Sequence, residues 1–390
     1  MDMNDRDEQL IRSFCDERGV QEQTRLGYMT TVGIYCQFHE MTFYELLEEA
    51  EQEERENVRW KFSKLRSRLL SFRNFLIKED YLVNTIQVYM GRLRTIYEEG
   101  FDIEIGKMPK INQRNAKKPE PICYTDLPDK ELLRHIIKMV NPLMKAIILF
   151  MTSSGCAKRE TLNLTVKDFV DATYEYHHKR NIYDAIEILK GRDDIVPSWR
   201  LRRQKTNKYY TAFSSPESTA EIIHYLLSEE RKLKNPSKLF SISDAHLNNT
   251  FNKINRQLNL GKVGTFNRFR SHMLRKFHAS QLYNDGLSMD EIDELQGRGK
   301  DRTRTSYFME NPLRLKEKYI EHMGAITINA DVEKLTIKSP EFMQMESENR
   351  FLKSELDELK TEVSDYSSVK AEVADLRAFK DEILHQKNKV

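Results

Sequence analysis

Apolar side chains recur every three or four positions over most of the first hundred residues, which is the spacing of helices with one buried face. In "DEQLIRSFCDERG" this face includes Leu10, Ile11, Phe14 and Cys15, and Gly19 provides a stop. A later series has the same spacing, at Phe62, Leu65, Leu69, Phe72, Phe75 and Leu76. The pattern predicts a compact bundle of four or five helices over residues 1–100.

The helical pattern stops at residues 101–125, "FDIEIGKMPKINQRNAKKPEPICYT". This segment has three prolines, two basic clusters and no helical periodicity, so we expect a linker between domains. Periodicity resumes at "DLPDKELLRHIIKMV" and continues to about residue 324. The sequence therefore predicts a second, mainly helical domain over residues 126–325.

In one segment of the second domain, residue types alternate along the chain instead of recurring with the helical period. "SWRLRRQKTNKYYTAF" is rich in aromatic and basic residues and has a turn signal at Thr206–Lys208. Alternation of this kind predicts two short strands around a turn. The predicted fold class is thus mainly α with a small β-sheet.

The last fifty residues, 341–390, form a separate pattern with no Gly or Pro. An apolar residue occurs at every third or fourth position, which predicts a coiled-coil helix, although consecutive three-residue steps depart from an ideal heptad. The alternative is a single helix packed on its own body. The apolar positions are Leu352, Leu356, Leu359, Val363, Tyr366, Val369, Val373, Leu376, Phe379 and Ile383.

Composition narrows the class of protein. Hydrophobic residues make up 39% and charged residues 32% of the chain, and Gly and Pro are few, which favours a soluble, helix-rich protein. No run of 18 apolar residues predicts a membrane span, and the acidic start has no apolar signal region. The four cysteines are scattered and lack metal-ligand spacing. We expect a cytoplasmic, reduced protein without a metal or other cofactor.

Charge adds a candidate binding surface. The net charge is +2, but residues 341–390 carry a net −4, so the rest of the chain is basic at +6. Basic side chains at helical spacing and on the predicted hairpin are suited to contact a phosphate backbone, although a solvated charged surface has the same composition. The candidates are Lys61, Lys64, Arg68, Arg200, Arg202, Arg203 and Lys208. Alternation also places Arg203 and Lys205 on one face of the hairpin.

The most specific chemical pattern begins at "SHMLRKFHAS". His272 and Arg275 are three positions apart on a predicted helix whose apolar positions include Met273 and Leu274. Taken alone, such a pair is usually a surface pair. Downstream, "ELQGRGKDRTRTSYF" places Arg298 after an apolar helix and Tyr307 nine positions later.

With these motifs, the chain resembles the tyrosine recombinases, or phage-integrase family, over roughly residues 5–325. It is similar to the divergent integrases of archaeal plasmids and viruses, which belong to mobile elements. "HMLRKFHAS" resembles the family box His-x-Leu-Arg-(basic)-x-x-Ala-(Thr/Ser). "LQGRGKDRTRTSYF" resembles its Leu-Gly-His box followed by Tyr, with Arg298 at the His position. "RRQKTNKYYTAF" resembles the β-hairpin that carries an active-site lysine, here Lys205, and the N-terminal helices resemble the core-binding domain.

One family box departs from the usual pattern. "FMTSSGCAKRETLNLTVKDF" resembles the box that holds the first active-site arginine, normally two positions after Gly. Aligned on Gly155 and Glu160, that position is Ala157. Either Arg159 or Lys158 takes over from a shifted position, or the site is weakened. We favour Arg159 because a guanidinium can bind a phosphate bidentately and an ammonium cannot.

The resemblance implies a site-specific DNA recombinase that cleaves and rejoins strands through a 3′-phosphotyrosine link, without metal or ATP. Tyr307 would attack the phosphate, and Arg275, Arg159 and Arg298 would stabilise its charge. His272 would add a hydrogen bond or take the tyrosine proton, and Lys205 would protonate the leaving 5′-oxygen. Tyr319 is the competing tyrosine, but its apolar surroundings are typical of packing.

The resemblance also implies partners and alternatives. The family acts on double-stranded DNA with a specific recombination site, gripped between two domains, and assembles as a tetramer. A coiled-coil tail would add a dimer contact, and a nucleoid-associated location would follow. Two other functions fit parts of the pattern. A DNA-binding architectural or regulatory protein without strand transfer fits the missing arginine at Ala157, and a relaxing topoisomerase would share the phosphotyrosine chemistry.

Overall fold

The computed structural model describes residues 4–111, 117–118, 120–203, 205, 207–299 and 311–329, together with 352, 353, 355, 356 and 360. The chain divides into two compact units, Met1–Pro121 and Ile122–Val390. Helices dominate both units, and the described strands pair only into two-stranded sheets. The predicted class, mainly α with a small β-sheet, is therefore confirmed. No helix in these ranges is both long and apolar enough to cross a membrane.

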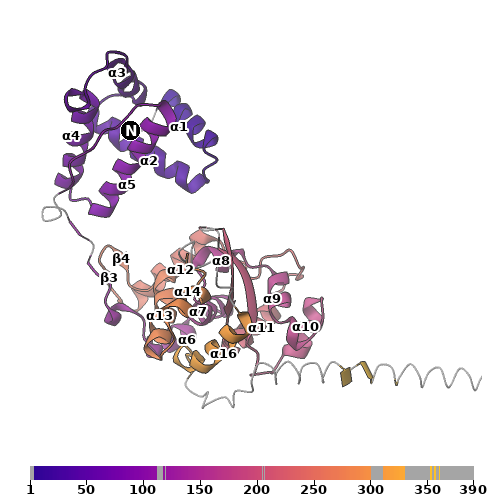
Figure 1. Cartoon of the computed structure of the whole chain (residues 1–390). Helices are drawn as coiled ribbons and strands as arrows, with labels where there is room; N and C mark the ends of the chain where they lie inside the picture. Colours follow the sequence, from indigo (N-terminus) through magenta and orange to yellow (C-terminus); the bar gives the residue numbers. More distant parts are fainter. Residues whose placement is uncertain are drawn as a thin grey trace, which may run out of the picture. The chain divides into compact units, whose positions relative to one another are not determined.

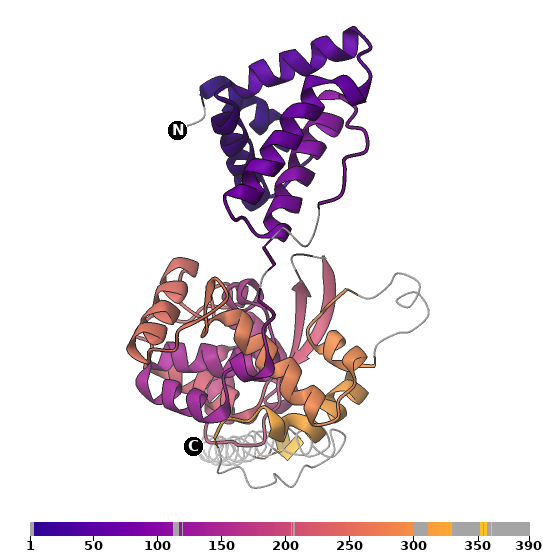
Figure 2. The ribbon, with the colours of Figure 1, turned by 90° about the vertical axis from the view of Figure 1, so that its left-hand side faces the viewer.

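The first unit is a helical bundle (Figures 1 and 2). In its core, α1 packs on α2 and α3 packs on α4. Both α2 and α4 also pack on α5. A short 3₁₀ turn precedes α4, and a π turn follows α5. The elements are α1 (Asp5–Glu17), α2 (Glu22–His39), α3 (Phe43–Arg55), η1 (Trp60–Phe62), α4 (Lys64–Lys78), α5 (Val83–Thr95) and η2 (Ile96–Gly100).

The helix α4 begins where its cap is, not where its apolar series begins. The Ser63 hydroxyl accepts a hydrogen bond from the Arg66 backbone N–H at 3.1 Å, which fixes the first turn. Leu65 and Phe72 then face the core of the first unit. Phe62 precedes the cap and is 71% exposed, so its predicted place on the buried face was wrong.

The first part of the predicted linker packs on the first unit. Ile103 and Ile105 are buried in its core, and the Ile103 backbone N–H donates to the Tyr97 carbonyl at 2.9 Å. Farther along, Lys117 forms an isolated bridge with Leu82. Because apolar side chains anchor it, residues 101–105 extend the bundle and are not free chain.

The second unit is larger and also mainly helical (Figure 1). Its helices are α6 (Lys130–Met139), α7 (Pro142–Ser154), α8 (Lys158–Asn163), α9 (Val166–Ala172), α10 (Ile182–Leu189), α11 (Pro216–Ser228), α12 (Asp244–Gln257), α13 (Ser271–Asn284), α14 (Met289–Leu295) and α16 (Pro312–His322). Short turns are η3 (Tyr124–Asp126), η4 (Tyr174–Tyr176) and η5 (Met323–Ala325). The strands are β1 (Ser198–Arg203), β2 (Lys208–Phe213), β3 (Lys262–Val263) and β4 (Phe266–Asn267).

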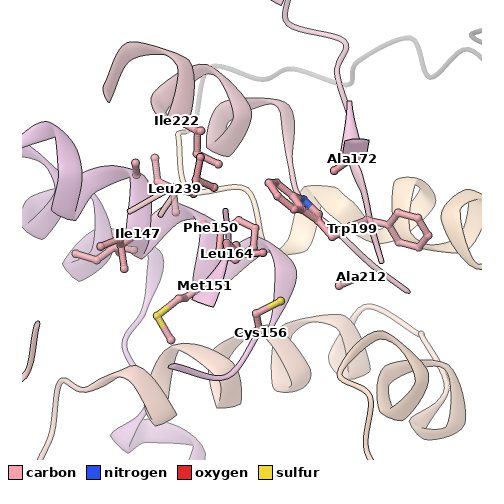
Figure 3. Packing of buried hydrophobic residues seen from close by; sticks show 14 of the residues in the cluster. Ile147, Phe150, Met151, Cys156, Leu164, Ala172, Trp199, Ala212, Ile222 and Leu239 are labelled. Carbon is pink, nitrogen blue, oxygen red and sulfur yellow. The ribbon is translucent and has the colours of Figure 1, made fainter. Parts of the chain in front are cut away.

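The helix α7 is the centre of the second unit. Every residue from Ala146 to Ser154 is buried, because α11 and α13 both pack against this helix. Asn141 caps its N-terminus, and Pro142 occupies the first turn, where a missing N–H costs nothing. Phe150 packs edge-on against Trp199 of β1, with ring centroids 5.0 Å apart (Figure 3). This contact attaches the hairpin to the core.

The predicted hairpin is present as β1 and β2, which pair antiparallel. Trp199 and Leu201 of β1 are buried, whereas Arg200 and Arg202 between them are exposed. On β2 the partner of Leu201 is the buried Tyr210. The hairpin therefore has an inner face toward the core and an outer face toward solvent, as alternation requires.

The predicted coiled coil lies almost entirely outside the described residues. The described positions in it are helical, and Leu352 and Leu356 are exposed there. The coiled coil stays a prediction.

Candidate active site

The site begins at the corner between α7 and α8. Gly155 ends α7 with φ +64°, and a Cβ at this position would lie 2.6 Å from Nδ1 of His278, so only glycine fits. Ala157 then caps α8, and its backbone N–H donates to Glu160 Oε2 at 2.8 Å. This corner turns the Gly155 carbonyl toward α13.

Arg275 crosses from α13 to this corner. It is 7% exposed. Its Nη1 donates to the Gly155 carbonyl and its Nη2 to the Gln296 carbonyl, both at 2.6 Å. Glu160 Oε2 lies 3.9 Å from Nη1. Burial lowers the pKa of Arg275, and the carboxylate of Glu160 opposes this; arginine nevertheless stays protonated in proteins. The guanidinium is therefore a fixed positive charge held by three elements.

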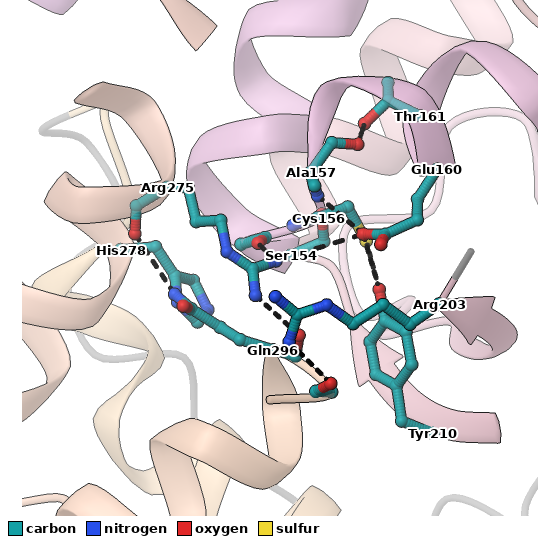
Figure 4. A network of polar contacts seen from close by, with 12 residues as sticks. Ser154, Cys156, Ala157, Glu160, Thr161, Arg203, Tyr210, Arg275, His278 and Gln296 are labelled. Carbon is teal, nitrogen blue, oxygen red and sulfur yellow. Dashed lines mark hydrogen bonds and ion pairs between the residues drawn. The ribbon is translucent and has the colours of Figure 1, made fainter. Parts of the chain in front are cut away.

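The turn after α14 is the second support for Arg275. The buried Gln296 side chain donates from Nε2 to the Arg275 carbonyl at 3.1 Å and contacts Nδ1 of His278 at 3.0 Å. Gly297 has φ +59°, and a Cβ there would lie 2.4 Å from the Tyr210 ring. Any larger residue at Gly297 would displace the turn or the hairpin. Figure 4 shows these side chains around the Arg275 guanidinium.

Glu160 and Tyr210 join the corner to the hairpin. The Tyr210 hydroxyl donates to Glu160 Oε2 at 3.1 Å and lies 3.8 Å from Cys156 Sγ. Burial is the first cause that raises the pKa of Tyr210 above its ordinary value, and it raises the pKa of Cys156 to about 12. At neutral pH both groups are protonated, so they position Glu160 and carry no charge of their own.

Arg203 is the last residue of β1 and lies in the same network. It follows Trp199 and Leu201 on the inner face of the hairpin, and it is partly buried. Its Nη1 donates to the Gly297 carbonyl at 2.7 Å. The sequence grouped Arg203 with the DNA-backbone residues, whereas the structure brings it to the turn that also holds Arg275.

His272 is exposed on the first turn of α13. Neighbouring atoms nevertheless shield its ring in part from water, and this desolvation is the first cause that lowers its pKa. The positive charges of Lys276, Arg270 and Arg275 lower the pKa further. The described residues form no ion pair with His272, Arg270 or Lys276. His272 is therefore neutral at pH 7 in a basic environment, where an anion would be stabilised.

The other predicted catalytic residues lie in different environments. Arg298 forms an ion pair with Asp293 at 3.1 Å. Lys205 is exposed in the turn between β1 and β2. Arg159 is exposed on the first turn of α8, and Tyr307 lies outside the described residues.

The two alternatives that the sequence left open have defined positions. Lys158 forms an ion pair with Asp244 at 2.6 Å. Tyr319 is fully buried, and its hydroxyl donates to the Ser153 carbonyl at 2.9 Å. Both side chains are thus occupied by contacts within the second unit.

The predicted DNA-binding residues fall into two groups. Arg68 is tied to Glu49, with Nη2 3.1 Å from Oε1, so its charge is compensated inside the first unit. Lys64 lies 3.4 Å from the same carboxylate but is largely exposed. The exposed remainder is Lys61 in the first unit and Arg200 and Arg202 on the outer hairpin face. Lys208, which pairs with Arg203 in the ladder, is partly buried.

Sequence reasoning missed Gln296 and Tyr210 and used Glu160 only for alignment. Glu160 has a local signal, since it stands three residues after the cap of α8. Gln296 precedes a glycine that needs positive φ, but its partners are about twenty residues away. Tyr210 contacts residues about fifty positions distant. Only the folded chain brings these groups together.

The arrangement is suited to bind an anion. Arg275, Arg203 and His272 come from two elements, and the neighbouring Glu160 is bound by donors of the protein. Guanidinium groups recognise phosphate oxygens through paired N–H donors. The network therefore has the chemistry of a phosphate site with charges fixed in advance.

Comparisons with known proteins bear on this unit. No curated protein matches the sequence. Among solved structures, the chain is similar to the XerH site-specific recombinase bound to a palindromic difH substrate in a post-cleavage complex, with 16% identity, a TM-score of 0.48, and 80% of this chain and 83% of that chain covered. It is also similar to the Tn1549 transposon integrase (aa 82–397) in complex with circular intermediate DNA, with 13% identity, a TM-score of 0.46, and coverage of 78% and 95%.

A third similar structure is a lambda integrase tetramer bound to a Holliday junction, with 14% identity, a TM-score of 0.44, and coverage of 86% of this chain and 79% of that chain. Identities and scores this low transfer no function to the chain. The sequence itself gives a more specific result, because residues 129–313 match the model of the phage integrase family. The whole of this match lies within the second unit.

Proposed function

We propose that the protein is a site-specific DNA recombinase that cleaves and rejoins DNA through a 3′-phosphotyrosine intermediate. The observation that carries the proposal is the buried Arg275, held between the Gly155 and Gln296 carbonyls within the residues that match the phage integrase family model. Packing alone does not require a charged group there, and the one carboxylate near it, Glu160 at 3.9 Å, already accepts hydrogen bonds from Ala157 and Tyr210. A phosphate ligand gives this charge a use.

In the proposed reaction the Tyr307 hydroxyl attacks a phosphodiester. A bond forms between the tyrosine oxygen and phosphorus, and the bond from phosphorus to the 5′-oxygen breaks. Arg275 neutralises charge on the non-bridging oxygens. His272, which is neutral at pH 7, accepts the tyrosine proton or donates a hydrogen bond to the phosphate. Lys205, exposed on the hairpin, gives a proton to the leaving oxygen.

The roles proposed for Arg298 and for the DNA-backbone residues depend on a change of contacts or on bound DNA. Arg298 would have to exchange its ion pair with Asp293 for the phosphate. Exposed Lys61, Arg200 and Arg202 would contact the DNA backbone, so affinity should fall with added salt. The expected partner is double-stranded DNA with a specific site, bound by a tetramer, and the tail would add a dimer contact.

The test is covalent trapping. The full chain is incubated with a nicked DNA substrate whose cleaved fragment diffuses away, and a protein–DNA adduct is measured on a denaturing gel. We expect an adduct with the wild type and none with Tyr307→Phe. Tyr319→Phe is the matched control, because it removes one buried hydroxyl but leaves the ring in the core. An adduct that persists in Tyr307→Phe, or a wild type that forms none on any recombination-site DNA, contradicts the proposal.

One observation favours a second function. Ala157 occupies the position of the first family arginine, and a protein that only binds DNA would not need that group. A DNA-binding regulatory protein on the same fold would bind duplex DNA in a salt-dependent way and form no adduct. The trapping experiment therefore separates the two functions directly.

A further inference from the structure

We infer that Arg203 is the second phosphate-binding guanidinium of the site and takes the role that Ala157 cannot fill. This inference rests on the proposed recombinase function. It assigns to the hairpin a catalytic residue that the family pattern places at the start of α8. It also replaces Arg159, which the sequence favoured for this role.

The Arg203 side chain belongs to the inner face of the hairpin. In β1 the residues of the inner face are Trp199, Leu201 and Arg203, while Arg200 and Arg202 face outward. A charged side chain on the inner face of a hairpin needs a polar partner. Arg203 has one in the Gly297 carbonyl, 2.7 Å from Nη1. The strand register therefore directs this guanidinium into the network.

Arg203 also lies beside Arg275. Arg275 donates to the carbonyl of Gln296, and Arg203 donates to the carbonyl of the next residue, Gly297. Figure 4 shows both side chains reaching the same turn from opposite sides. The positive charge of Arg203 is also among the causes that lower the pKa of Arg275. The turn thus sets two guanidinium groups next to each other.

Arg203 has more N–H donors than its contacts with the described residues use. An arginine has five N–H donors, and within the described part of the chain only Nη1 of Arg203 makes a hydrogen bond. Nε and Nη2 remain for a ligand. The side chain is partly exposed, so a phosphate can reach it without unfolding the site. Two adjacent guanidinium groups match the two non-bridging oxygens of a phosphodiester.

Lys158 and Arg159, the competing residues on α8, lie in positions less suited to bind the phosphate. Lys158 is held by Asp244, 2.6 Å away, and by the side-chain oxygen of Asn248 at 3.3 Å. Arg159 is exposed on the first turn of α8. The geometry therefore favours the hairpin residue.

The test compares Arg203→Ala, Arg203→Lys and Arg159→Ala in the full chain, with Arg180→Ala as the control. Arg180 is an exposed arginine of the second unit outside the network. Each variant receives two nicked substrates, one with an ordinary scissile phosphodiester and one with a methylphosphonate, in which a methyl group replaces a charged oxygen. The rate of adduct formation is measured at saturating DNA.

We expect Arg203→Ala to slow adduct formation on the phosphodiester by about 100-fold, the cost of removing one donor that stabilises transition-state charge. The same variant should approach the wild-type rate on the methylphosphonate, because the neutral group no longer needs the second cation. Arg203→Lys should be intermediate, and Arg159→Ala and Arg180→Ala should be close to wild type. Rescue by the neutral phosphate distinguishes phosphate binding from a merely structural role.

Three results would overturn the inference. An Arg203→Ala variant equally slow on both substrates would mean that Arg203 only holds the Gly297 turn. A variant with normal rates would mean that Arg203 has no role in cleavage. If the methylphosphonate restored the rate of Arg159→Ala and not that of Arg203→Ala, the second phosphate-binding guanidinium would be Arg159 on α8. All three leave the proposed function intact, whereas a wild type that forms no adduct contradicts the proposed function itself.

Discussion

Two basic helices of this chain differ in how their charges are balanced. On α4 of the first unit, Arg68 and Lys64 share the carboxylate of Glu49. The hydrogen bond from Arg68 lowers the pKa of Glu49 and keeps it ionised. Around the start of α13, within the described residues, Arg270, His272 and Lys276 have no carboxylate partner. The two helices therefore differ at these residues: Lys64 and Arg68 of α4 have a carboxylate partner, whereas the three around the start of α13 have none within the described residues.

Pairing with carboxylates, and not the number of basic residues, separates the candidate phosphate site from the basic residues of α4 at Lys64 and Arg68. A cation bound to a carboxylate has already exchanged its hydration for a partner, so a phosphate must displace that partner first. Arg275 donates its hydrogen bonds to the neutral Gly155 and Gln296 carbonyls. Its nearest carboxylate, Glu160, lies 3.9 Å away and already accepts from the Ala157 N–H and the Tyr210 hydroxyl, so it neutralises Arg275 less than a direct hydrogen-bonded partner would. Three measurements test whether the two helices differ in this way.

The largest effect is expected at Arg275. Arg275→Ala should slow adduct formation by about 1000-fold, because it removes a transition-state charge partner and leaves two buried carbonyls without donors. Arg275→Lys should also be slow, since an ammonium cannot reach both carbonyls. Single-turnover trapping measures both rates, and Arg68→Ala serves as the counterpart from α4. Equal losses at Arg275 and Arg68 would remove the distinction between the two helices.

A smaller effect is expected from acid at His278 on α13. Burial is the main cause that lowers its folded-state pKa to about 3 from an ordinary 6.5. Between these values the unfolded chain binds a proton that the folded chain does not, so the free energy of unfolding falls as the pH falls. Burial also lowers the pKa of His177 to about 4, so this residue likewise lowers the free energy of unfolding as the pH falls.

Urea titrations at pH 7 and pH 4 test this expectation. The wild type should lose about 3 kcal/mol more than His278→Phe between the two values, since each pKa unit is worth about 1.4 kcal/mol. Hydrogen exchange of peptides from α13 should show that stability is lost in this helix when the pH falls to 4. Identical pH slopes for the two proteins would show that His278 is protonated in the fold without cost.

The smallest effects are expected on α4 and the turn before it. Arg68→Ala should lower the free energy of unfolding by about 1–2 kcal/mol, because it leaves the partly buried Glu49 unpaired. It should leave the salt dependence of DNA binding unchanged. Lys61→Ala should do the reverse, with little effect on stability and a salt slope lower by about one. Fluorescence anisotropy against salt separates the two variants, and a reduced slope for Arg68→Ala would show that its ion pair opens on DNA.

Local patterns made the elements predictable. Alternation over Ser198–Phe213 gave the hairpin, and the apolar positions of α13 gave the face formed by Met273, Leu274 and Phe277. Two features that were predicted wrongly also depend on local sequence. The cap at Ser63 starts α4 after Phe62, and the alternating Ile103 and Ile105 pack where prolines suggested a linker.

The partners of the candidate site could not be predicted in the same way. Arg203 and Gly297 are 94 positions apart, and Arg275 and Gly155 are 120 apart. No periodicity in a single chain specifies such pairs, since they depend on how α13, the hairpin and the corner after α7 pack. His272 and Arg275 were expected on one face, yet one is exposed and the other is buried. That both residues lie on one helix was thus predictable from the sequence, but their burial was not.

The buried thiol beside Tyr210 has a practical consequence for chemical labelling. Thiol reagents attack the thiolate, and the raised pKa of Cys156 leaves almost none at neutral pH. Burial also raises the pKa of Cys36 to about 12 and that of Cys15 above its ordinary value. Cys123, near the start of the second unit, is the exposed thiol. A maleimide dye should therefore attach at Cys123 and report on DNA binding without disturbing the candidate active site.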